Sequence, residues 1–172
     1  TTYLCPSDPS AGTSNLNTSG APGAISSYAS NGFAFGKYTG TFPNVIVSNN
    51  IGCSGGGCSA GYKTILGASS DGLSNTIFWA EKYGTCDNGG SVWATNCSCN
   101  QWNPALGFQT GVANMFQIQP TPFNSATCNP WVAQTGHSGA ILVGLGDGSV
   151  RACTTSTNAM TWLMALVPDD GS

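Results

Sequence analysis

Residues 137–156 read HSGAILVGLGDGSVRACTTS, in which two apolar, partly β-branched runs flank Gly146-Asp147-Gly148. Gly and Asp tolerate the positive φ of a hairpin turn, so this stretch predicts two antiparallel strands. It also holds the chain's only histidine, His137, followed after nine residues by Asp147-Gly148. A strand of that length sets His137 and Asp147 about 25 to 30 Å apart, at about 3.3 Å per residue. The spacing therefore argues against a His–Asp catalytic dyad and predicts a structural role for His137.

The segments on either side extend this pattern to the whole chain. Apolar runs bounded by turn residues predict further strands at 42–49, 62–66 and 74–84, with a polar turn at 69–72. Apolar residues behind Ser/Thr capping candidates predict a short helix within 155–167. Turn formers dominate 5–32, which we interpret as a surface loop, and 84–131 is expected to be irregular. We predict one domain over 1–172 of the mainly β (α+β) class: an antiparallel sheet with long disulfide-stapled loops and a short C-terminal helix.

Charged residues make up only 6% of the 172 residues, hydrophobic residues make up 40%, and the formal net charge is −3. So little charge favours an extracellular or cell-surface protein that is packed in an assembly or carries sugars. The few basic residues are scattered, which excludes the clustered footprint of a nucleic-acid-binding protein. No apolar run approaches the roughly 18 residues of a membrane span, so no transmembrane segment is predicted.

The eight cysteines are disulfide candidates, because an even number in an extracellular chain is typical of a disulfide framework; they are Cys5, Cys53, Cys58, Cys86, Cys97, Cys99, Cys128 and Cys153. Zinc is the competing explanation, but the spacings are not those of zinc knuckles and His137 is far from any Cys pair in sequence. We expect all eight to be oxidised. Cys53–Cys58 is the favoured local pair, and Cys86 with Cys97 or Cys99 is plausible. The connectivity stays open.

Other candidate sites are weak. Asp71 and its neighbours, or Asp169-Asp170, offer oxygen atoms for calcium without the spacing of a calcium-binding loop, so calcium stays an alternative to turn capping. Tryptophans within 84–131 could stack on sugars, although core filling is favoured. Asn17 and Asn96 begin N-glycosylation patterns, which leaves glycans open as partners. An oxidised cysteine is not a nucleophile, and no triad or carboxylate pair is evident, so no enzyme, cofactor or metal is predicted.

Three segments in order carry a resemblance to a known family: TTYLCPSDPS followed by SYASNG, then SSDGLSNTIFWAE, then His137 with nine residues before Asp147-Gly148 and a closing helix. The chain resembles the planctomycete-type pseudopilin-like proteins of unknown function, related to type IV pilins and type II secretion pseudopilins, from Tyr3 to Val167. The resemblance implies a structural role for the residues at the family's signature positions. These are Asp71, Ser74, Asn75, Thr76, Glu81, His137, Asp147 and Gly148.

The resemblance implies a structural subunit: the globular head of an extracellular pilus-like filament or pseudopilus. Such subunits polymerise through an N-terminal hydrophobic helix that also covers one sheet face. That helix is not in this sequence, so we expect it to have been cut off or to belong to a separate helical pilin subunit. The bare sheet face then predicts self-association or contact with that subunit. The alternative is a secreted or cell-surface binding module for polysaccharide.

Overall fold

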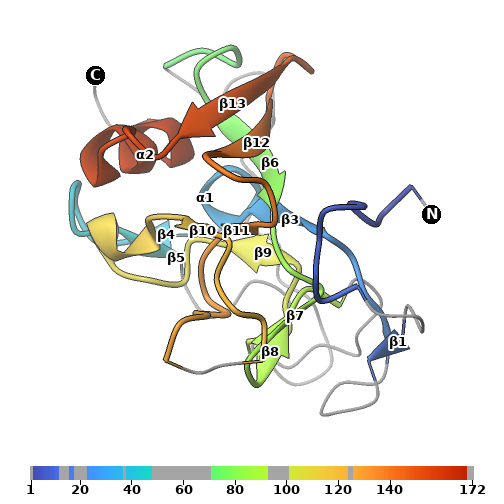
Figure 1. Cartoon of the computed structure of the whole chain (residues 1–172). Helices are drawn as coiled ribbons and strands as arrows, with labels where there is room; N and C mark the ends of the chain where they lie inside the picture. Colours follow the sequence, from blue (N-terminus) through green and yellow to red (C-terminus); the bar gives the residue numbers. More distant parts are fainter. Residues whose placement is uncertain are drawn as a thin grey trace.

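The computed structural model describes residues 2–11, 16–17, 23–36, 38–47, 71–92, 101–123 and 126–169. Its main element is a five-stranded sheet with the strand order β13-β12-β6-β3-β9 (Figure 1). The strands are β3 (Tyr28–Asn31), β6 (Ile77–Glu81), β9 (Ala105–Leu106), β12 (Ala140–Leu145) and β13 (Val150–Thr154). Neighbours are antiparallel except β3 and β9, which run parallel. The mainly β class is confirmed, with a mixed rather than wholly antiparallel sheet.

Short elements surround this sheet. The two-stranded pairs are β1 (Leu16–Asn17) with β2 (Gly23–Ala24), β4 (Tyr38–Thr39) with β5 (Ile46–Val47), β7 (Thr85–Cys86) with β8 (Gly89–Gly90), and β10 (Gln117–Ile118) with β11 (Gln134–Thr135). The helices are α1 (Gly32–Phe35), a 3-10 turn η1 (Gly111–Asn114) and α2 (Ala159–Leu166). None of these helices is long and apolar enough to cross a membrane.

The hairpin predicted from 137–156 is confirmed. Strands β12 and β13 pair from Ala140↔Thr154 to Gly144↔Val150. In the turn, Gly148 takes a φ of +85°, which only glycine adopts without strain, and Ser149 N donates to Asp147 Oδ1 at 2.9 Å. The strand expected within 74–84 is β6, and that within 42–49 is reduced to β5. The strand expected at 62–66 lies outside the described residues.

The prediction of a loop over 5–32 is wrong for β3, which is a central strand. Its sequence, YASN, has little strand propensity, so its conformation comes from its neighbours. Ala29 is fully buried opposite Ala80 of β6, where small side chains let the core pack closely. Asn31, also buried, donates from Nδ2 to the carbonyl oxygens of Ile77 and Leu166 at 2.6 Å each.

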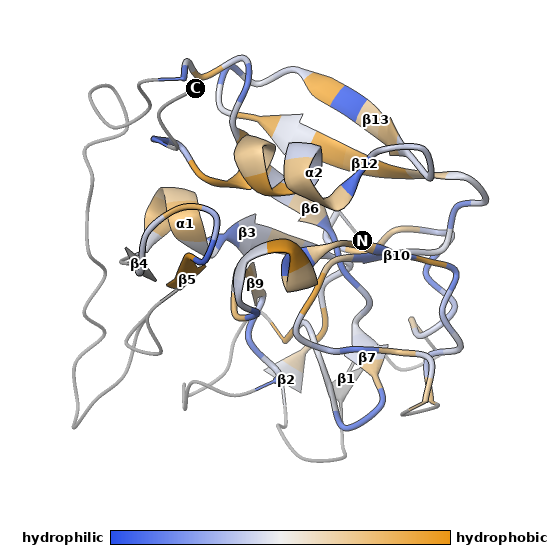
Figure 2. Ribbon diagram, turned by 90° about the vertical axis from the view of Figure 1, so that its left-hand side faces the viewer, coloured by the Kyte–Doolittle hydropathy of each residue, from blue (hydrophilic) through white to orange (hydrophobic). Residues whose placement is uncertain are grey.

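Helix α2 covers one face of the sheet, here called the inner face (Figure 2). Asn158, rather than a Ser or Thr, caps the helix by accepting from Thr161 N at 2.8 Å. Trp162, Leu163 and Leu166 are buried in the cluster that holds the inward side chains of the sheet. The Trp162 ring packs edge-on against Phe116, with centroids 4.8 Å apart, and its Nε1 donates to Asn114 O at 2.9 Å.

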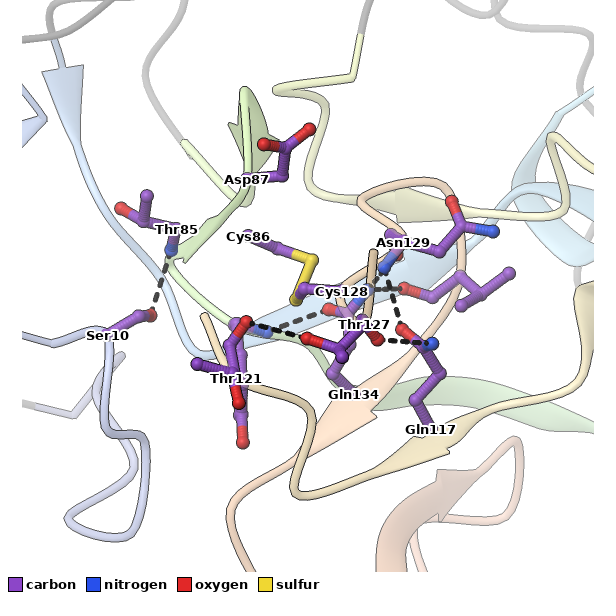
Figure 3. The surroundings of a disulfide bond; sticks show 12 residues. Ser10, Thr85, Cys86, Asp87, Gln117, Thr121, Thr127, Cys128, Asn129 and Gln134 are labelled. Carbon is purple, nitrogen blue, oxygen red and sulfur yellow. Dashed lines mark hydrogen bonds between the residues drawn. A yellow bond between two sulfur atoms is a disulfide. The ribbon is translucent and has the colours of Figure 1, made fainter. Parts of the chain in front are cut away.

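One disulfide lies within the described residues. It joins Cys86 of β7 to Cys128, 42 residues away, and so ties the β7–β8 pair to the loop that follows β10 (Figure 3). Gln117 holds the same loop, because its Nε2 donates to Thr127 O at 2.9 Å and its Oε1 accepts from Asn129 N at 2.8 Å.

Two expectations about the cysteines are therefore wrong. Cys86 pairs with Cys128 rather than with Cys97 or Cys99, and Cys5 and Cys153 are free thiols. Cys5 is buried against polar side chains of the sheet, and Cys153 lies on the edge strand β13. Neither is bonded to another cysteine. Cys53, Cys58, Cys97 and Cys99 lie outside the described residues.

The state of the cysteines gives a first prediction. Alkylation of the unfolded chain without reductant, followed by peptide mapping, should label Cys5 and Cys153 and leave Cys86 and Cys128 linked in one disulfide-bonded peptide pair. A peptide in which Cys5 or Cys153 is disulfide-bonded would contradict the thiol assignments.

The packing of α2 gives a second prediction. Leu163 is fully buried, whereas Met164, the next residue, is exposed. Leu163→Ala should lower the free energy of unfolding by about 2–5 kcal/mol, because it removes buried methyl groups and leaves a cavity. Met164→Ala is the matched control and should change it by less than about 0.5 kcal/mol. Urea denaturation followed by circular dichroism measures both, and equal losses would contradict the assignment of the buried helix face.

Candidate functional site

Strands β6 and β12 bring the separated signature segments together. They pair antiparallel, with Val143 opposite Ala80 and Gly144 opposite Trp79. Asp71 precedes β6 and Glu81 ends it, whereas His137 precedes β12 and Asp147 follows it. Because the strands run in opposite directions, the two Asp-Gly turns meet at one end of the pair. Glu81 and His137 meet at the other end.

At the turn end, the contacts are those of two docked turns. Asn75 Nδ2 donates to Asp71 O at 2.9 Å and Thr76 Oγ1 donates to Gly72 O at 3.1 Å. The hairpin turn then bonds to this segment, since Gly146 N donates to Thr76 O at 3.0 Å and Asp147 N donates to Leu73 O at 3.2 Å. Ser74 is exposed at the same turn. Backbone carbonyl oxygens accept all four of these bonds.

At the other end lies a group that the sequence analysis did not anticipate, the Cys5–Glu81–His137 cluster. His137 Nε2 lies 3.1 Å from Glu81 Oε1. Cys5 Sγ lies 3.6 Å from Glu81 Oε1 and 3.6 Å from His137 Nε2. Cys5 and Glu81 are buried, while the His137 side chain is 38% exposed. A thiol, a carboxylate and an imidazole therefore converge where the buried part of the structure meets the surface.

Two hydrogen bonds fix the Glu81 carboxylate through the oxygen that faces away from the cluster. This oxygen, Oε2, accepts from Thr135 Oγ1 at 2.7 Å and from Leu142 N at 2.9 Å. Thr135 Oγ1 also accepts from His137 N at 3.1 Å. One threonine hydroxyl thus positions both Glu81 and the backbone of His137, which leaves Glu81 Oε1 directed at the imidazole and the thiol.

Cys5 is delivered by the Cys-Pro-Ser-Asp segment, whose anchor is Asp8. The buried Asp8 carboxylate accepts from Ser10 N at 2.9 Å, Ser10 Oγ at 2.6 Å, Ser27 Oγ at 2.7 Å and Gly84 N at 3.0 Å. The segment also lies directly against Gly136, where an added Cβ would fall 1.6 Å from Ser7 O. Glycine before His137 is therefore needed for Cys5 to reach the imidazole.

This arrangement does not favour a nucleophilic cysteine. Burial raises the pKa of the Cys5 thiol, and the nearby carboxylates of Glu81 and Asp8 act in the same direction. A reactive cysteine needs the opposite environment. In addition, the same imidazole nitrogen faces both the thiol and the carboxylate, whereas a catalytic relay uses the two ring nitrogens separately. Cys5 is a free thiol, not the oxidised residue expected from the sequence, but its surroundings still do not favour nucleophilic catalysis.

A groove of about 520 Å³ lies on the outer face of the sheet and is lined by Thr2, Tyr3, Ser26, Tyr28, Ser30, Trp79 and Pro104. Tyr28 pairs with Glu81 across β3 and β6, so the groove adjoins the cluster. The tryptophans within 84–131 are the other candidates for sugar stacking, although core filling is favoured for them. Trp102 is buried there and Trp131 is partly buried against the core, so neither supplies an open platform. Trp93 lies outside the described residues.

The family is shown by comparison with known proteins. Residues 1–160 match the family described as a protein of unknown function, DUF1559. The chain belongs to the DUF1559 family. No curated protein and no solved structure matches this DUF1559 chain. With no match to compare, the arrangement of its signature segments is described from the contacts of this chain alone.

Asp8 gives a third prediction, with a matched control in the same chain. Asp147 makes the same local contacts as Asp8, accepting from the N and Oγ of the serine two residues later, but it is exposed. Asp8→Ala should lower the free energy of unfolding by about 2–4 kcal/mol, because it also leaves the buried donors of Ser27 and Gly84 unpaired. Asp147→Ala should cost much less. Urea denaturation compares the two, and equal effects would show that Asp8 does not anchor the segment.

Proposed function

We propose that this DUF1559 chain is the globular head of an extracellular pilus-like filament or pseudopilus. The observation that carries the proposal is a band of exposed apolar side chains on the outer face of the sheet. The band consists of Tyr28, Trp79, Leu142 and Val150, from the four adjacent strands β3, β6, β12 and β13. Trp79 is 50% exposed and Val150 is 68% exposed.

The band contrasts with the inner face. Helix α2 covers the inner face, and Ile141, Val143 and Leu145 of β12 are buried beneath it. Leu142, between two of these residues, points outward and is exposed. A sheet normally buries its apolar face against another layer, and a continuous exposed apolar patch marks an interaction surface. An apolar helix of a filament subunit would supply that layer for the outer face.

The low charge of the chain supports the same proposal. Glu81, on the same face, is buried, the four exposed side chains of the band are uncharged, and the whole chain carries only four basic and seven acidic residues. Neutral polar and apolar surfaces pack against a neighbouring subunit at less desolvation cost than charged ones. The proposed location is therefore extracellular or at the cell surface, within an assembly.

A second function has an observation of its own. The groove that adjoins the cluster carries the exposed rings of Tyr3, Tyr28 and Trp79, and it is large enough for a sugar unit. Aromatic faces of this kind stack on sugar rings, so a cell-surface binding module for polysaccharide is the alternative. Polysaccharide binding would use only the groove, whereas filament assembly would use the whole band.

The fourth prediction separates the two functions. The full-length gene product, tagged and produced in its source organism, should appear in a sheared surface fraction as filaments visible by electron microscopy. Leu142→Glu combined with Val150→Glu should remove the chain from those filaments, because it places two charges in the proposed interface. Phe123→Glu, at an exposed apolar residue outside the sheet, is the control and should leave assembly unchanged.

Circular dichroism of the purified variants would verify that both fold. A wild-type chain that stays monomeric at the surface, and that loses polysaccharide binding on Trp79→Ala, would contradict the filament proposal and support the binding module.

A further inference from the structure

We propose that Cys5, Glu81 and His137 form a binding site for one Zn²⁺ ion, which clamps the N-terminal Cys-Pro-Ser-Asp segment to β6 and to the start of the β12 hairpin. Within the described residues, this is the group of His, Cys, Asp and Glu side chains whose ligand atoms lie close enough together to share an ion. The inference is independent of whether the chain forms filaments.

The distances match those of a tetrahedral ion. Zinc binds sulfur at about 2.3 Å and nitrogen or oxygen at about 2.0–2.1 Å, so tetrahedral angles separate sulfur from either by about 3.6 Å and nitrogen from oxygen by about 3.3 Å. The observed separations are 3.6 Å for Cys5 Sγ to Glu81 Oε1, 3.6 Å for Cys5 Sγ to His137 Nε2, and 3.1 Å for His137 Nε2 to Glu81 Oε1. All three donor atoms form one face of such a tetrahedron.

Charge selects a divalent cation. A Cys5 thiolate and a Glu81 carboxylate carry two negative charges, which a Zn²⁺ ion neutralises while His137 binds as neutral imidazole. Charged side chains are tolerated in a buried place when their charges cancel. The carboxylate of Asp8 adds negative potential close to Cys5. The neighbouring Lys82 does not compete for these groups, because its Nζ donates to Asn103 O and Ala105 O at 2.8 and 3.2 Å.

The donor set also selects the metal. A mixed group of one sulfur, one nitrogen and one oxygen suits zinc, whereas calcium and magnesium bind through oxygen alone. The supporting contacts are those of a built metal site, since Thr135 Oγ1 and Leu142 N hold the oxygen of Glu81 that faces away from the cluster. The partial exposure of His137 gives an ion a path from solvent and leaves the fourth position for water.

The site explains why Cys5 is a free thiol in a chain with other cysteines in a disulfide. A structural metal fixes three segments that are far apart in sequence, as a disulfide fixes two. For a chain in which only 6% of the residues are charged, such a clamp at the end of the central strands stabilises the fold without adding surface charge.

The fifth prediction is that the chain, stripped with a chelator and dialysed, binds added Zn²⁺ and Co²⁺. Titration calorimetry with Zn²⁺ should show a site that Cys5→Ser, Glu81→Gln and His137→Ala each weaken more than about 100-fold, since changes to outer-shell residues alone cost about 10- to 100-fold. With Co²⁺, the wild-type chain should show a near-ultraviolet thiolate-to-cobalt charge-transfer band that is absent in Cys5→Ser.

The controls address other ligands and folding. Cys153→Ser, at the other free thiol, and Asp147→Asn, at an exposed carboxylate, should leave the affinity and stoichiometry unchanged. His137 is partly exposed, so His137→Ala should fold, which circular dichroism verifies. Zinc should raise the melting temperature of the wild-type chain but not that of His137→Ala. An unchanged zinc stoichiometry and affinity in Cys5→Ser and His137→Ala, or no binding by the wild-type chain, would overturn the proposal.

Discussion

The antiparallel pairing of β6 with β12 is the constraint on which the rest of the structure depends. With Val143 opposite Ala80, the two Asp-Gly turns lie at one end of the pair, and Glu81, which accepts from Leu142 N, lies at the other end beside His137. A shift of the register by one residue would turn every side chain to the opposite face. The docked turns, through Gly146 N and Asp147 N, hold that register. The signature segments are thus two ends of a single strand pair.

The end of the strand pair that holds the Cys5–Glu81–His137 cluster depends on the buried carboxylate of Glu81. Glu81 lies on the outer face, where Tyr28 and Trp79 are exposed, yet it is covered by the Cys-Pro-Ser-Asp segment. Burial of a carboxylate is costly unless donors or a cation compensate. Thr135 and Leu142 supply two donors, and His137 and Cys5 supply the remaining contacts. The N-terminal segment therefore protects the one strongly polar place on a largely apolar face.

The sequence was sufficient to predict what local patterns determine. The hairpin around Asp147-Gly148, strand β6 and helix α2 each carry their own periodicity or turn chemistry, and each was predicted. Strand β3 was missed because Ala29 and Ser30 have no strand signal, and only their contacts with β6 make them a strand. The cluster was missed for a similar reason. Cys5, Glu81 and His137 were each singled out, but their convergence depends on the strand register and on Gly136, which no local pattern reveals.

We propose that Cys5, Glu81 and His137, which are far apart in sequence, hold one ion together. Zinc K-edge X-ray absorption on the full chain loaded with one equivalent of Zn²⁺ tests it most directly. We expect a first shell with one sulfur at about 2.3 Å and three nitrogen or oxygen atoms at about 2.0–2.1 Å. A shell with no sulfur, or with two or more, would contradict it.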